Sequence, residues 1–416
     1  MIRNFLSVSA YGGGALGALL FSLVVVHLFG VDVLGQFSVM YSLAQFVTLL
    51  ARRGMGVSLA RYVAGEKKML RINGLIFCNK RGFKASLLGL LALLIVSICF
   101  LFNGSFDYFI TGFFLSFSVI PGVYMFIYSG YMRGVRQVFK SALFTNGYVF
   151  LFVSCGLIIL SWFGINSVGA VAFTFVMVQF TWAFILSRKF VLFLLKNYAN
   201  KKWSSHRDGI VSSSNNISAS NVFSSFFSII SVFLVGCFVS DEEVGYFKIF
   251  TQIITLATFV TSVLTASVSS QISADFKTGN LEKLQQTSAK LSFMQLLALP
   301  FCVMGSFLHL YISGALFIEV LPGIAFILMF FALISQVIYG SATNWLNLTK
   351  YDAAVRKVLM IIFLPLIILF SYFAFKFGLV GAVLCLFMGF LLQTMALYFM
   401  LRAKIPINYP SYQRLL

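Results

Sequence analysis

Three arginines lie in or beside an apolar stretch that is long enough to enter a bilayer, residues 36–68. They are Arg52, Arg53 and Arg61, and no acid follows until Glu66. A charged side chain at the centre of a membrane helix costs about 2.5–3.5 kcal/mol on insertion scales, so it is usually kept only beside protein interior or a water-filled path. Guanidinium groups stay protonated, and their planar forks suit phosphate. The stretch therefore predicts a membrane-embedded site for an anion.

Polar side chains extend the arginines into a stripe with helical spacing. Its members are Ser38, Tyr41, Gln45, Thr48 and Arg52. We expect one transmembrane helix over residues 36–60 with a wet, cationic face. At ~1.5 Å per residue from Gln36, Arg52 lies ~24 Å along this helix and Arg61 ~38 Å. Because the hydrocarbon core is about 30 Å thick, we expect Arg52 and Arg53 inside it, near the cytoplasmic mouth, and Arg61 at the headgroups.

Each of these residues also has a plainer interpretation. Arg61 reaches lipid headgroups by snorkelling, and Arg52 and Arg53 lie on a short helix that leaves the membrane early. Lys248 snorkels to the outer interface. The Thr and Ser residues of the eighth span serve helix packing.

The composition is that of an integral membrane protein. The 416 residues are 60% hydrophobic and 10% charged, with a mean hydropathy of +0.97, well outside the range of soluble domains. The net charge of +19 is expected in cytoplasmic loops and not at a nucleic acid, because no recognition module is present. The six cysteines are scattered without a CxxC pair, which is typical of small apolar packing residues.

We predict an all-α protein with about twelve transmembrane helices in two parallel six-helix lobes around a central lumen, residues 1–200 and 201–416. The predicted spans are 7–29, 36–60, 85–102, 108–132, 141–162, 167–187, 216–239, 246–273, 290–312, 321–346, 358–375 and 378–401.

Basic residues alternate between the two sides of these spans. One side carries 25 of the 30 Lys and Arg, the other carries Lys376 alone, and the four left over are Arg52, Arg53, Arg61 and Lys248. The positive-inside rule then places both termini in the cytoplasm. We expect a multi-pass membrane protein.

An internal repeat relates the two lobes. With a shift of 210 residues, the motif Asp32-x-x-Gly35-x-Phe37 falls on 242–247, which reads Glu-x-x-Gly-x-Phe. The polar stripe of the second span falls on a second one that starts at Lys248. Two copies with the same orientation are typical of transporters whose halves are related about the membrane normal.

The two stripes predict the site. For the anion we expect Arg52, Arg53 and Arg61, with Lys248 near the outer mouth. The residues expected to line the lumen are Tyr41, Gln45, Thr48, Asn221, Gln252, Thr255 and Thr258.

Signals of an enzyme are missing from the sequence. It has no phosphate-binding loop with Lys, no HExxH and no nucleophile elbow. No Asp or Glu lies centrally in a predicted span, and His27, His206 and His309 are far apart without a paired acid. We therefore expect no enzyme, no cofactor and no metal.

Two segments resemble a known transporter family. The first segment is VDVLGQFSVMYSLAQ, followed by GMGVSLARYVAGEKK, and the second is SDEEVGYFKIFTQI, leading to SSQISADFKTGNLEKL. They resemble the polysaccharide-transporter branch, the Wzx-type O-antigen flippases. This branch belongs to the multidrug/oligosaccharidyl-lipid/polysaccharide exporter superfamily, whose fold is MATE-like. The resemblance covers the whole chain.

The resemblance implies a function in O-antigen or lipopolysaccharide biosynthesis. The substrate would be an undecaprenyl-diphosphate-linked oligosaccharide, moved from the cytoplasmic to the outer leaflet. The implied partners are this lipid-linked oligosaccharide, membrane lipids, a polysaccharide polymerase and a chain-length regulator. The first span lacks the acid that drug-exporting relatives often carry. Two alternatives stay open: a small-molecule or multidrug exporter of the same superfamily, and a scaffolding membrane protein.

Overall fold

The computed structural model describes residues 2–63, 68–135, 137–144, 146–197, 207–317, 321–349 and 351–411. Almost all of these residues are helical, and none of the described ones lies in a strand, so the predicted all-α class is confirmed. The chain divides into two compact units, Met1–Val222 and Phe223–Leu416. The predicted boundary between residues 200 and 201 falls within 198–206, outside the described residues, and the division into six-helix lobes stays a prediction.

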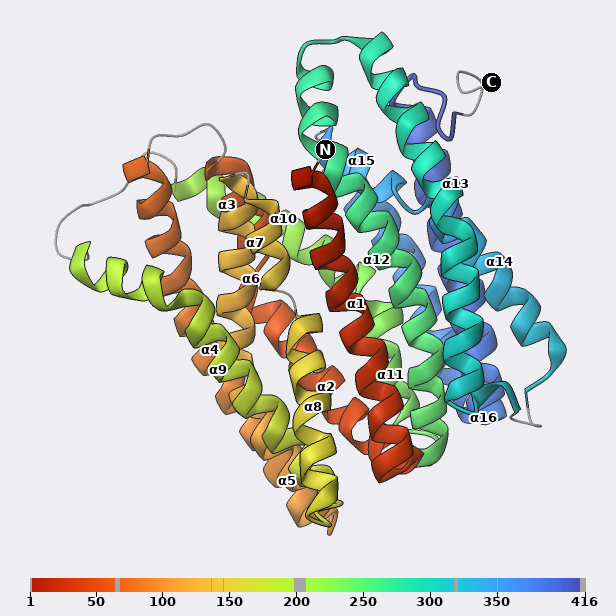
Figure 1. The fold of residues 1–416 in the computed structure, drawn as a ribbon. Coiled ribbons are helices and arrows are strands. Elements are labelled where there is room, and N and C mark those ends of the chain that lie inside the picture. The colour runs from red at the N-terminus through yellow and green to blue at the C-terminus, as the bar shows by residue number, and fades with distance from the viewer. Residues whose placement is uncertain are drawn as a thin grey trace. The chain divides into compact units, whose positions relative to one another are not determined.

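The N-terminal unit is a bundle of long helices (Figure 1). Its helices are α1 (Ile2–Phe29), α2 (Val31–Arg52), α3 (Met55–Val63), α4 (Lys68–Phe102), α5 (Phe106–Phe117), α6 (Val119–Gly134), α7 (Val138–Leu143), α8 (Asn146–Trp162), α9 (Val168–Asn197) and most of α10 (Arg207–Ser224).

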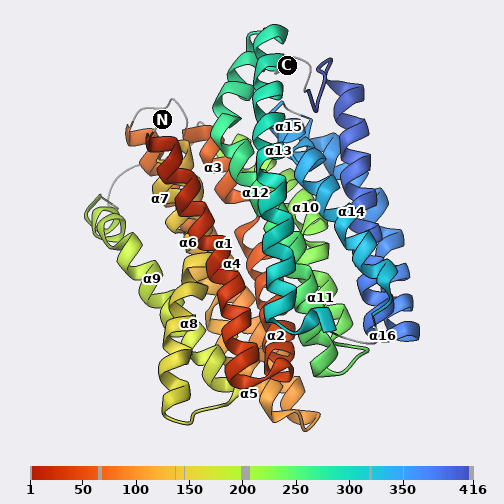
Figure 2. The ribbon, with the colours of Figure 1, turned by 45° about the vertical axis from the view of Figure 1, so that its right-hand side comes forward.

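The C-terminal unit is dominated by three helices of more than thirty residues, α12, α13 and α16 (Figure 2). Its elements are the π-helical turn η1 (Phe226–Ile230), α11 (Ser231–Val235), α12 (Asp241–Lys277), α13 (Leu281–Ile312), the 3₁₀ turn η2 (Ala315–Phe317), α14 (Gly323–Tyr339), α15 (Ala342–Leu348) and α16 (Asp352–Lys404).

Nine helices of the described chain are long and apolar enough to cross a membrane, or ten if the bent pair Ile217–Ser224 and Phe226–Val235 is one span. The apolar helix Asn146–Trp162 has 17 residues and is shorter than all of them. The span Ala353–Lys404 has 52 residues and is broken at Gly378, whose φ of 57° is non-helical. Each predicted span corresponds to a helical segment when the bent pair is taken as one span, the short helix Asn146–Trp162 is included, and Ala353–Lys404 is divided at Gly378.

The second predicted span is not one continuous helix. It was expected over residues 36–60, but α2 begins at Val31 and ends at Arg52. Arg53 has left-handed backbone angles (φ 44°, ψ 40°) and Gly54 follows with φ 64°, so the chain turns before α3 begins. The axial distance expected for Arg61 on a continuous helix is therefore wrong.

A parallel seam joins α2 and α3 to α6, with partners 74 residues apart. A Cβ atom on Gly122 would lie 3.1 Å from Thr48, and one on Gly134 would lie 3.1 Å from the Cα of Ala60. The tightest point is Gly130, where a Cβ atom would lie 2.0 Å from the carbonyl oxygen of Gly56. The three α6 positions are separated by multiples of four residues, as expected for one face of a helix.

The C-terminal unit repeats this parallel arrangement. Helix α12 begins at Asp241, 210 residues after the start of α2 at Val31. It pairs with the α14–α15 segment through hydrogen bonds from Gln336 Nε2 to Thr261 Oγ1 (3.5 Å) and from Thr265 Oγ1 to Ser341 Oγ (2.9 Å). The partners are 75 and 76 residues apart, close to the spacing in the first seam.

The C-terminal segment 405–411 packs onto the same unit as α16. Tyr409 is only 1% exposed, and its hydroxyl donates to Gln295 Oε1 (3.0 Å) and to the carbonyl of Ile338 (2.9 Å). Gln295 in turn donates to Ser341 Oγ (2.8 Å). This segment therefore ties α13 to the junction of α14 and α15.

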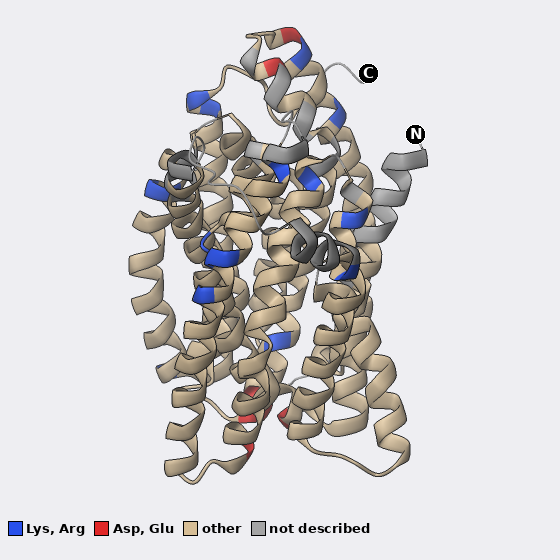
Figure 3. Ribbon diagram, turned by 90° about the vertical axis from the view of Figure 1, so that its left-hand side faces the viewer, with Lys and Arg blue, Asp and Glu red and all other residues tan. Residues whose placement is uncertain are grey.

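Charges are distributed unevenly along the helices. Within each unit taken by itself, Figure 3 shows Lys and Arg mainly toward one end of the helices, with Asp and Glu at the opposite end or beside some of the basic residues. The alternation of basic and non-basic connections in the sequence predicts such a pattern. Burial of helix sides in lipid explains the many exposed large apolar side chains, such as Phe102, Phe301 and Ile361.

Candidate functional site

Arg52 occupies a position in the seam between α2 and α6. Its guanidinium carbon lies 3.9 Å from the centroid of the Phe126 ring, a cation–π contact at the same 74-residue spacing. Its Nε atom is buried and has no hydrogen-bond partner among the described residues. A buried donor left unpaired costs about 1–3 kcal/mol. The side chain is thus held by an aromatic ring, with a donor free for an anion.

Arg53 forms the turn that ends α2. Its side chain is exposed, its backbone N–H donates to the carbonyl of Leu50 (3.2 Å), and its own carbonyl accepts from the hydroxyl of Ser214 on α10. Gly54 fits tightly below it, because a Cβ atom there would lie 2.7 Å from the carbonyl oxygen of Ser214. Helix α10 therefore fixes the turn that separates the two adjacent guanidinium groups.

Further cations surround this turn. Arg133, in the last turn of α6, is exposed and lies within electrostatic range of Arg52. Like charges close together are destabilising unless an anion screens them. Arg61 lies on α3, but its side chain is outside the described part of the chain.

The remaining stripe of α2 is packed inside the N-terminal unit. Tyr41 stacks on Phe37 (ring centroids 5.5 Å apart) and meets Phe175 edge-on at 5.2 Å. Asn146 on α8 donates weakly to Tyr41 and to Gln45, at 3.5 Å each. Within the N-terminal unit these side chains contact α8 and α9, and their place in a lumen stays a prediction.

Thr48 is also buried. Its hydroxyl donates to the carbonyl of Ala44 at 2.8 Å, and Gly122 leaves room beside it for Gln179 on α9. Gln179 is 0% exposed, and neither of its amide atoms has a partner among the described residues. The sequence prediction missed Gln179 and Asn146, because each stands alone in an apolar span without a polar stripe to mark it.

The C-terminal candidates lie on α12, apart from Asn221, which lies on α10 and within the N-terminal unit. Lys248 is half-buried and Gln252 buried, while Thr255 and Thr258 are exposed. The hydroxyls of Thr255 and Thr258 donate to backbone carbonyls four residues earlier, at 2.9 Å and 2.8 Å. The structure describes the two units separately, so it does not bring Lys248 and the arginines into one site.

A second polar cluster in the C-terminal unit centres on Gln336 of α14. This side chain donates to Thr258 (3.4 Å) and accepts from Thr394 on α16 (3.1 Å). The cluster satisfies its own hydrogen-bonding groups. Thr258 of the predicted stripe thus contacts α14, a contact that serves packing between α12 and α14.

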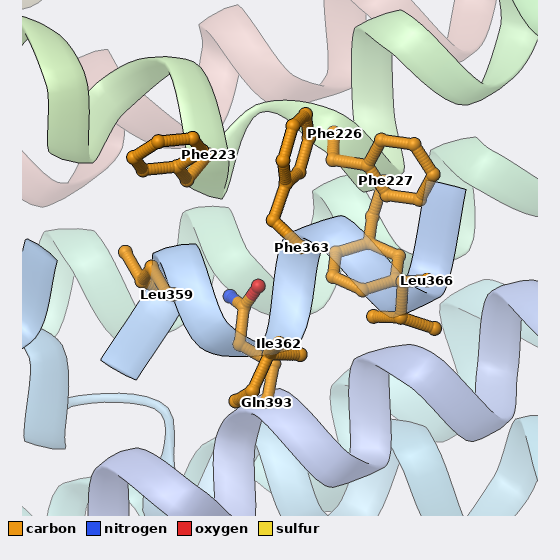
Figure 4. Close-up of a pocket in the computed structure, with 8 residues that line it drawn as sticks. All are labelled: Phe223, Phe226, Phe227, Leu359, Ile362, Phe363, Leu366 and Gln393. Atoms are coloured by element: carbon orange, nitrogen blue, oxygen red, sulfur yellow. The ribbon is translucent and has the colours of Figure 1, made fainter. Parts of the chain in front are cut away.

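An aromatic pocket in the same unit is a weaker candidate (Figure 4). It is formed by Phe223, Phe226, Phe227, Leu359, Ile362, Phe363, Leu366 and Gln393. About 170 Å³ of space lies between these atoms, and Gln393 is their one polar side chain. Small-molecule sites normally have a larger volume and several converging polar groups. We interpret this pocket as loose packing around the bend before α11.

In the described part of the chain, no three His, Cys, Asp or Glu residues lie close enough together to hold a metal ion. All six cysteines are free.

No family model matches the sequence, and no curated protein does. Solved structures do match. An inward-facing multidrug resistance MATE family transporter of the MOP superfamily is 14% identical, with a TM-score of 0.64 over 97% of this chain and 98% of that one. A MOP superfamily transporter from Pyrococcus furiosus, described as having a binding pocket of reverse polarity, is 15% identical, with a TM-score of 0.69 over 97% and 95%.

The lipid II flippase MurJ, in an inward closed conformation, is also similar. It is 14% identical, with a TM-score of 0.68 over 96% of this chain and 87% of that chain. At such identities the likeness shows the fold alone. The protein therefore has the MATE-like fold of the MOP superfamily and is a multi-pass membrane protein.

The contact with Phe126 gives a testable expectation for the arginine site. Replacing Phe126 by Leu keeps an apolar side chain but removes the ring face. A cation–π contact contributes ~0.5–2 kcal/mol, so we expect the affinity for inorganic pyrophosphate to fall by roughly 2- to 30-fold. Calorimetric titration of the purified protein measures this. Phe109→Leu, an aromatic position on α5 that contacts other rings, should bind like wild type; equal affinities for all three proteins would contradict the expectation.

Proposed function

We propose that this protein is a flippase that moves an undecaprenyl-diphosphate-linked oligosaccharide, such as an O-antigen repeat unit, from the cytoplasmic to the outer leaflet of the bacterial inner membrane. The observation that carries the proposal is Arg52. A permanently charged side chain stands in a membrane helix, stacked on an aromatic ring, with a buried donor unpaired. Intramembrane charges of this kind mark substrate or ion pathways.

The chemistry of this site favours a phosphorylated ligand. Arg52 and Arg53 are adjacent, Arg133 is within electrostatic range, and no carboxylate of the described chain is paired with any of them. Guanidinium groups bind phosphate oxygens through paired hydrogen bonds. A diphosphate brings two negatively charged groups to three cations, which relieves their mutual repulsion.

The comparisons support the same class of substrate. One structural neighbour is a lipid II flippase, and another is described by a binding pocket of reverse polarity. The fold alone does not choose between these and drug exporters. In this chain it is the arginines that favour an anionic headgroup.

In the proposed mechanism the diphosphate is attracted by Arg61 and held by Arg52 and Arg53. Lys248 receives it toward the outer side, and the sugar contacts the polar residues of α2 and α12. The stripe on α2 is packed in this structure, so substrate entry requires Tyr41 and Gln45 to separate from Asn146. Those 3.5 Å hydrogen bonds are weak enough to break at small cost. A negative-inside potential favours outward movement of an anion by about 2.3 kcal/mol per charge per 100 mV.

A multidrug exporter is the second candidate, because one of the structural neighbours is a multidrug resistance transporter. That function predicts efflux of cationic dyes. The unpaired arginines oppose it, because they repel cations.

The first experiment compares surface-polysaccharide display in a host deleted for this gene and supplied with wild type or with Arg52→Ala/Arg53→Ala. Lipid-linked oligosaccharide is quantified in the same cells. We expect lost display and accumulation of the intermediate on the cytoplasmic side, because the diphosphate has lost both of its fork-shaped donors. Lys376→Ala is the matched control and should restore display, because among the described residues this cation contacts Tyr372 and Phe377 on its own helix. Normal display in the double variant, or reduced dye efflux without a polysaccharide defect, would contradict the proposal.

A further inference from the structure

His309 is a buried titratable group of the C-terminal unit. It lies in the last turn of α13, a membrane-spanning helix, and is 3% exposed. Neither ring nitrogen has a hydrogen-bond partner among the described residues. Buried polar groups are nearly always paired, and an intramembrane ionisable residue is by default a functional group.

The buried face of α13 continues from His309 as a polar stripe. Hydroxyl, amide and thiol groups recur every third or fourth residue, with one gap beside Pro300, at Ser288, Ser292, Gln295, Cys302, Ser306 and His309. The hydroxyls of Ser292 and Ser306 donate to carbonyls one turn earlier, at 2.9 Å and 2.8 Å. Ser288 and Gln295 belong to the network with segment 405–411. The stripe thus places His309 on the same buried face of α13 as these polar groups.

The charged surroundings of His309 are sparse. The elements that pack against α13 are α12, α14 and η2. Neither α14 nor η2 contains a charged residue, and the charged residues of α13 itself, Glu282, Lys283 and Lys290, lie toward its opposite end. Tyr311, two residues away, is exposed. Glu319 lies outside the described residues.

On α12 the nearest charged residue is Lys248. The two helices are antiparallel, and a Cβ atom on Gly305 would lie 3.7 Å from Leu256. His309 comes one turn after Gly305 on α13, so it is level with Gln252, which comes one turn before Leu256 on α12. Lys248 lies one further turn along α12 from Gln252. The acids Asp241, Glu242 and Glu243 are at the start of α12, and Glu243 already accepts hydrogen bonds from Ser240 and from the backbone of Leu379.

We propose that His309 is a proton-binding site of the C-terminal unit, and that its protonation opens the end of α13 that is packed in this structure. A neutral imidazole tolerates this apolar environment, whereas an unpaired buried imidazolium carries a large desolvation cost. Proton binding therefore shifts the population toward conformations in which this end of α13 meets water. Histidine is suited to the role because its charge ordinarily changes between about pH 5 and 8.

The consequence for transport rests on the proposed function. Proton uptake at His309 would place a positive charge beside Lys248, which the proposed mechanism assigns to the diphosphate near its exit. The chain has no carboxylate centrally in a span, so His309 supplies a titrating group for coupling to a proton gradient. The orientation predicted from the basic loops places it toward the outer side.

The test is hydrogen–deuterium exchange of the full-length protein in lipid nanodiscs, at acidic and alkaline pH, after correction for the intrinsic pH dependence of exchange. We expect exchange in the peptide around residues 300–312 to rise several-fold at acidic pH in wild type and to stay flat in His309→Gln. His27→Gln is the matched control: His27 is exposed and its Nδ1 contacts the carbonyl of Leu23 at 3.0 Å, so the rise should persist.

A second measurement does not depend on a variant. The chain has three histidines, so NMR of the protein labelled with ¹³C-histidine follows each imidazole directly. A His309 signal that stays neutral between about pH 5 and 8, or a His309→Gln protein that opens as wild type does, would overturn the proposal. Neither readout involves a substrate. Failure of the arginine variants to affect polysaccharide display would therefore not contradict the proposal for His309. Likewise, failure of the His309 experiments would not contradict the proposed flippase function.

Discussion

Replacing Gly130 by Ala should destabilise the N-terminal unit and abolish function, although it adds only one methyl group. The added Cβ atom would lie 2.0 Å from the carbonyl oxygen and 2.6 Å from the Cα of Gly56. Backbone atoms cannot rotate away as a side chain does, so α3 has to move off α6. Overpacking of this kind costs about 1–3 kcal/mol, more than the up to ~1 kcal/mol that Ala gains over Gly in a helix.

The matched control is the same substitution at Gly12. A Cβ atom there meets nothing within 4 Å beyond the neighbouring backbone of its own helix, so the helix-propensity gain is unopposed and the effect should have the opposite sign. Thermal unfolding of both variants in detergent measures the difference. The Gly130 variant should also lose pyrophosphate binding, because Arg52 and Phe126 belong to the same seam. Equal unfolding temperatures for the two variants would show that the seam is not close-packed.

Truncating Tyr409 should destabilise the C-terminal unit by about as much as removing a core residue. Its ring is buried against Trp345, with centroids 6.2 Å apart, and its hydroxyl holds both Gln295 and the carbonyl of Ile338. Deleting a buried aromatic side chain costs about 3–5 kcal/mol. Tyr409→Ala should therefore lower the unfolding temperature strongly and release segment 405–411 to proteases.

Tyr409→Phe separates the two contributions of this residue. It keeps the ring and removes the hydroxyl, so the expected loss is about 1–3 kcal/mol, the cost of leaving buried partners unpaired. A truncation variant as stable as the Phe variant would mean that the ring contributes nothing. Phe399→Ala, an aromatic residue of α16 that is 64% exposed, provides the baseline for losing an aromatic side chain outside the core.

Composition and periodicity predict much of this fold because they report burial and helical period directly. The long apolar runs locate the helices, and the alternation of basic connections predicts their orientation. The repeated Gly-x-Phe motif makes α12 the counterpart of α2 in the sequence repeat. The break after Arg52 was missed. Residues 36–60 read as one helix, because an arginine with φ 44° leaves no signal in a hydrophobic pattern. Only the following Gly54 hints at a turn.

The site was predicted less completely than the fold. Arginines in an apolar span are visible in the sequence, whereas the ring that holds Arg52 is one of 50 phenylalanines and becomes distinctive only through the seam. Tyr41 and Thr48 are predicted to line a lumen because they are polar, and this stays a prediction; within the N-terminal unit they contact α8, α9 and α6. Periodicity identifies a polar face but not what that face contacts. His309 was set aside because no motif surrounds it, and its lack of partners is a property of packing alone.

The parallel seam also sets a delay during synthesis. Arg52 leaves the ribosome 74 residues before Phe126, and the chain between them contains α4 and α5. At about 5–20 residues per second, Arg52 waits roughly 4–15 s for its ring. During that interval α2 has neither α6 nor the turn-capping Ser214, and the lone guanidinium must be tolerated by lipid or by the insertion machinery. The residue proposed to hold the substrate thus also opposes insertion of α2 into the membrane until α6 has been made.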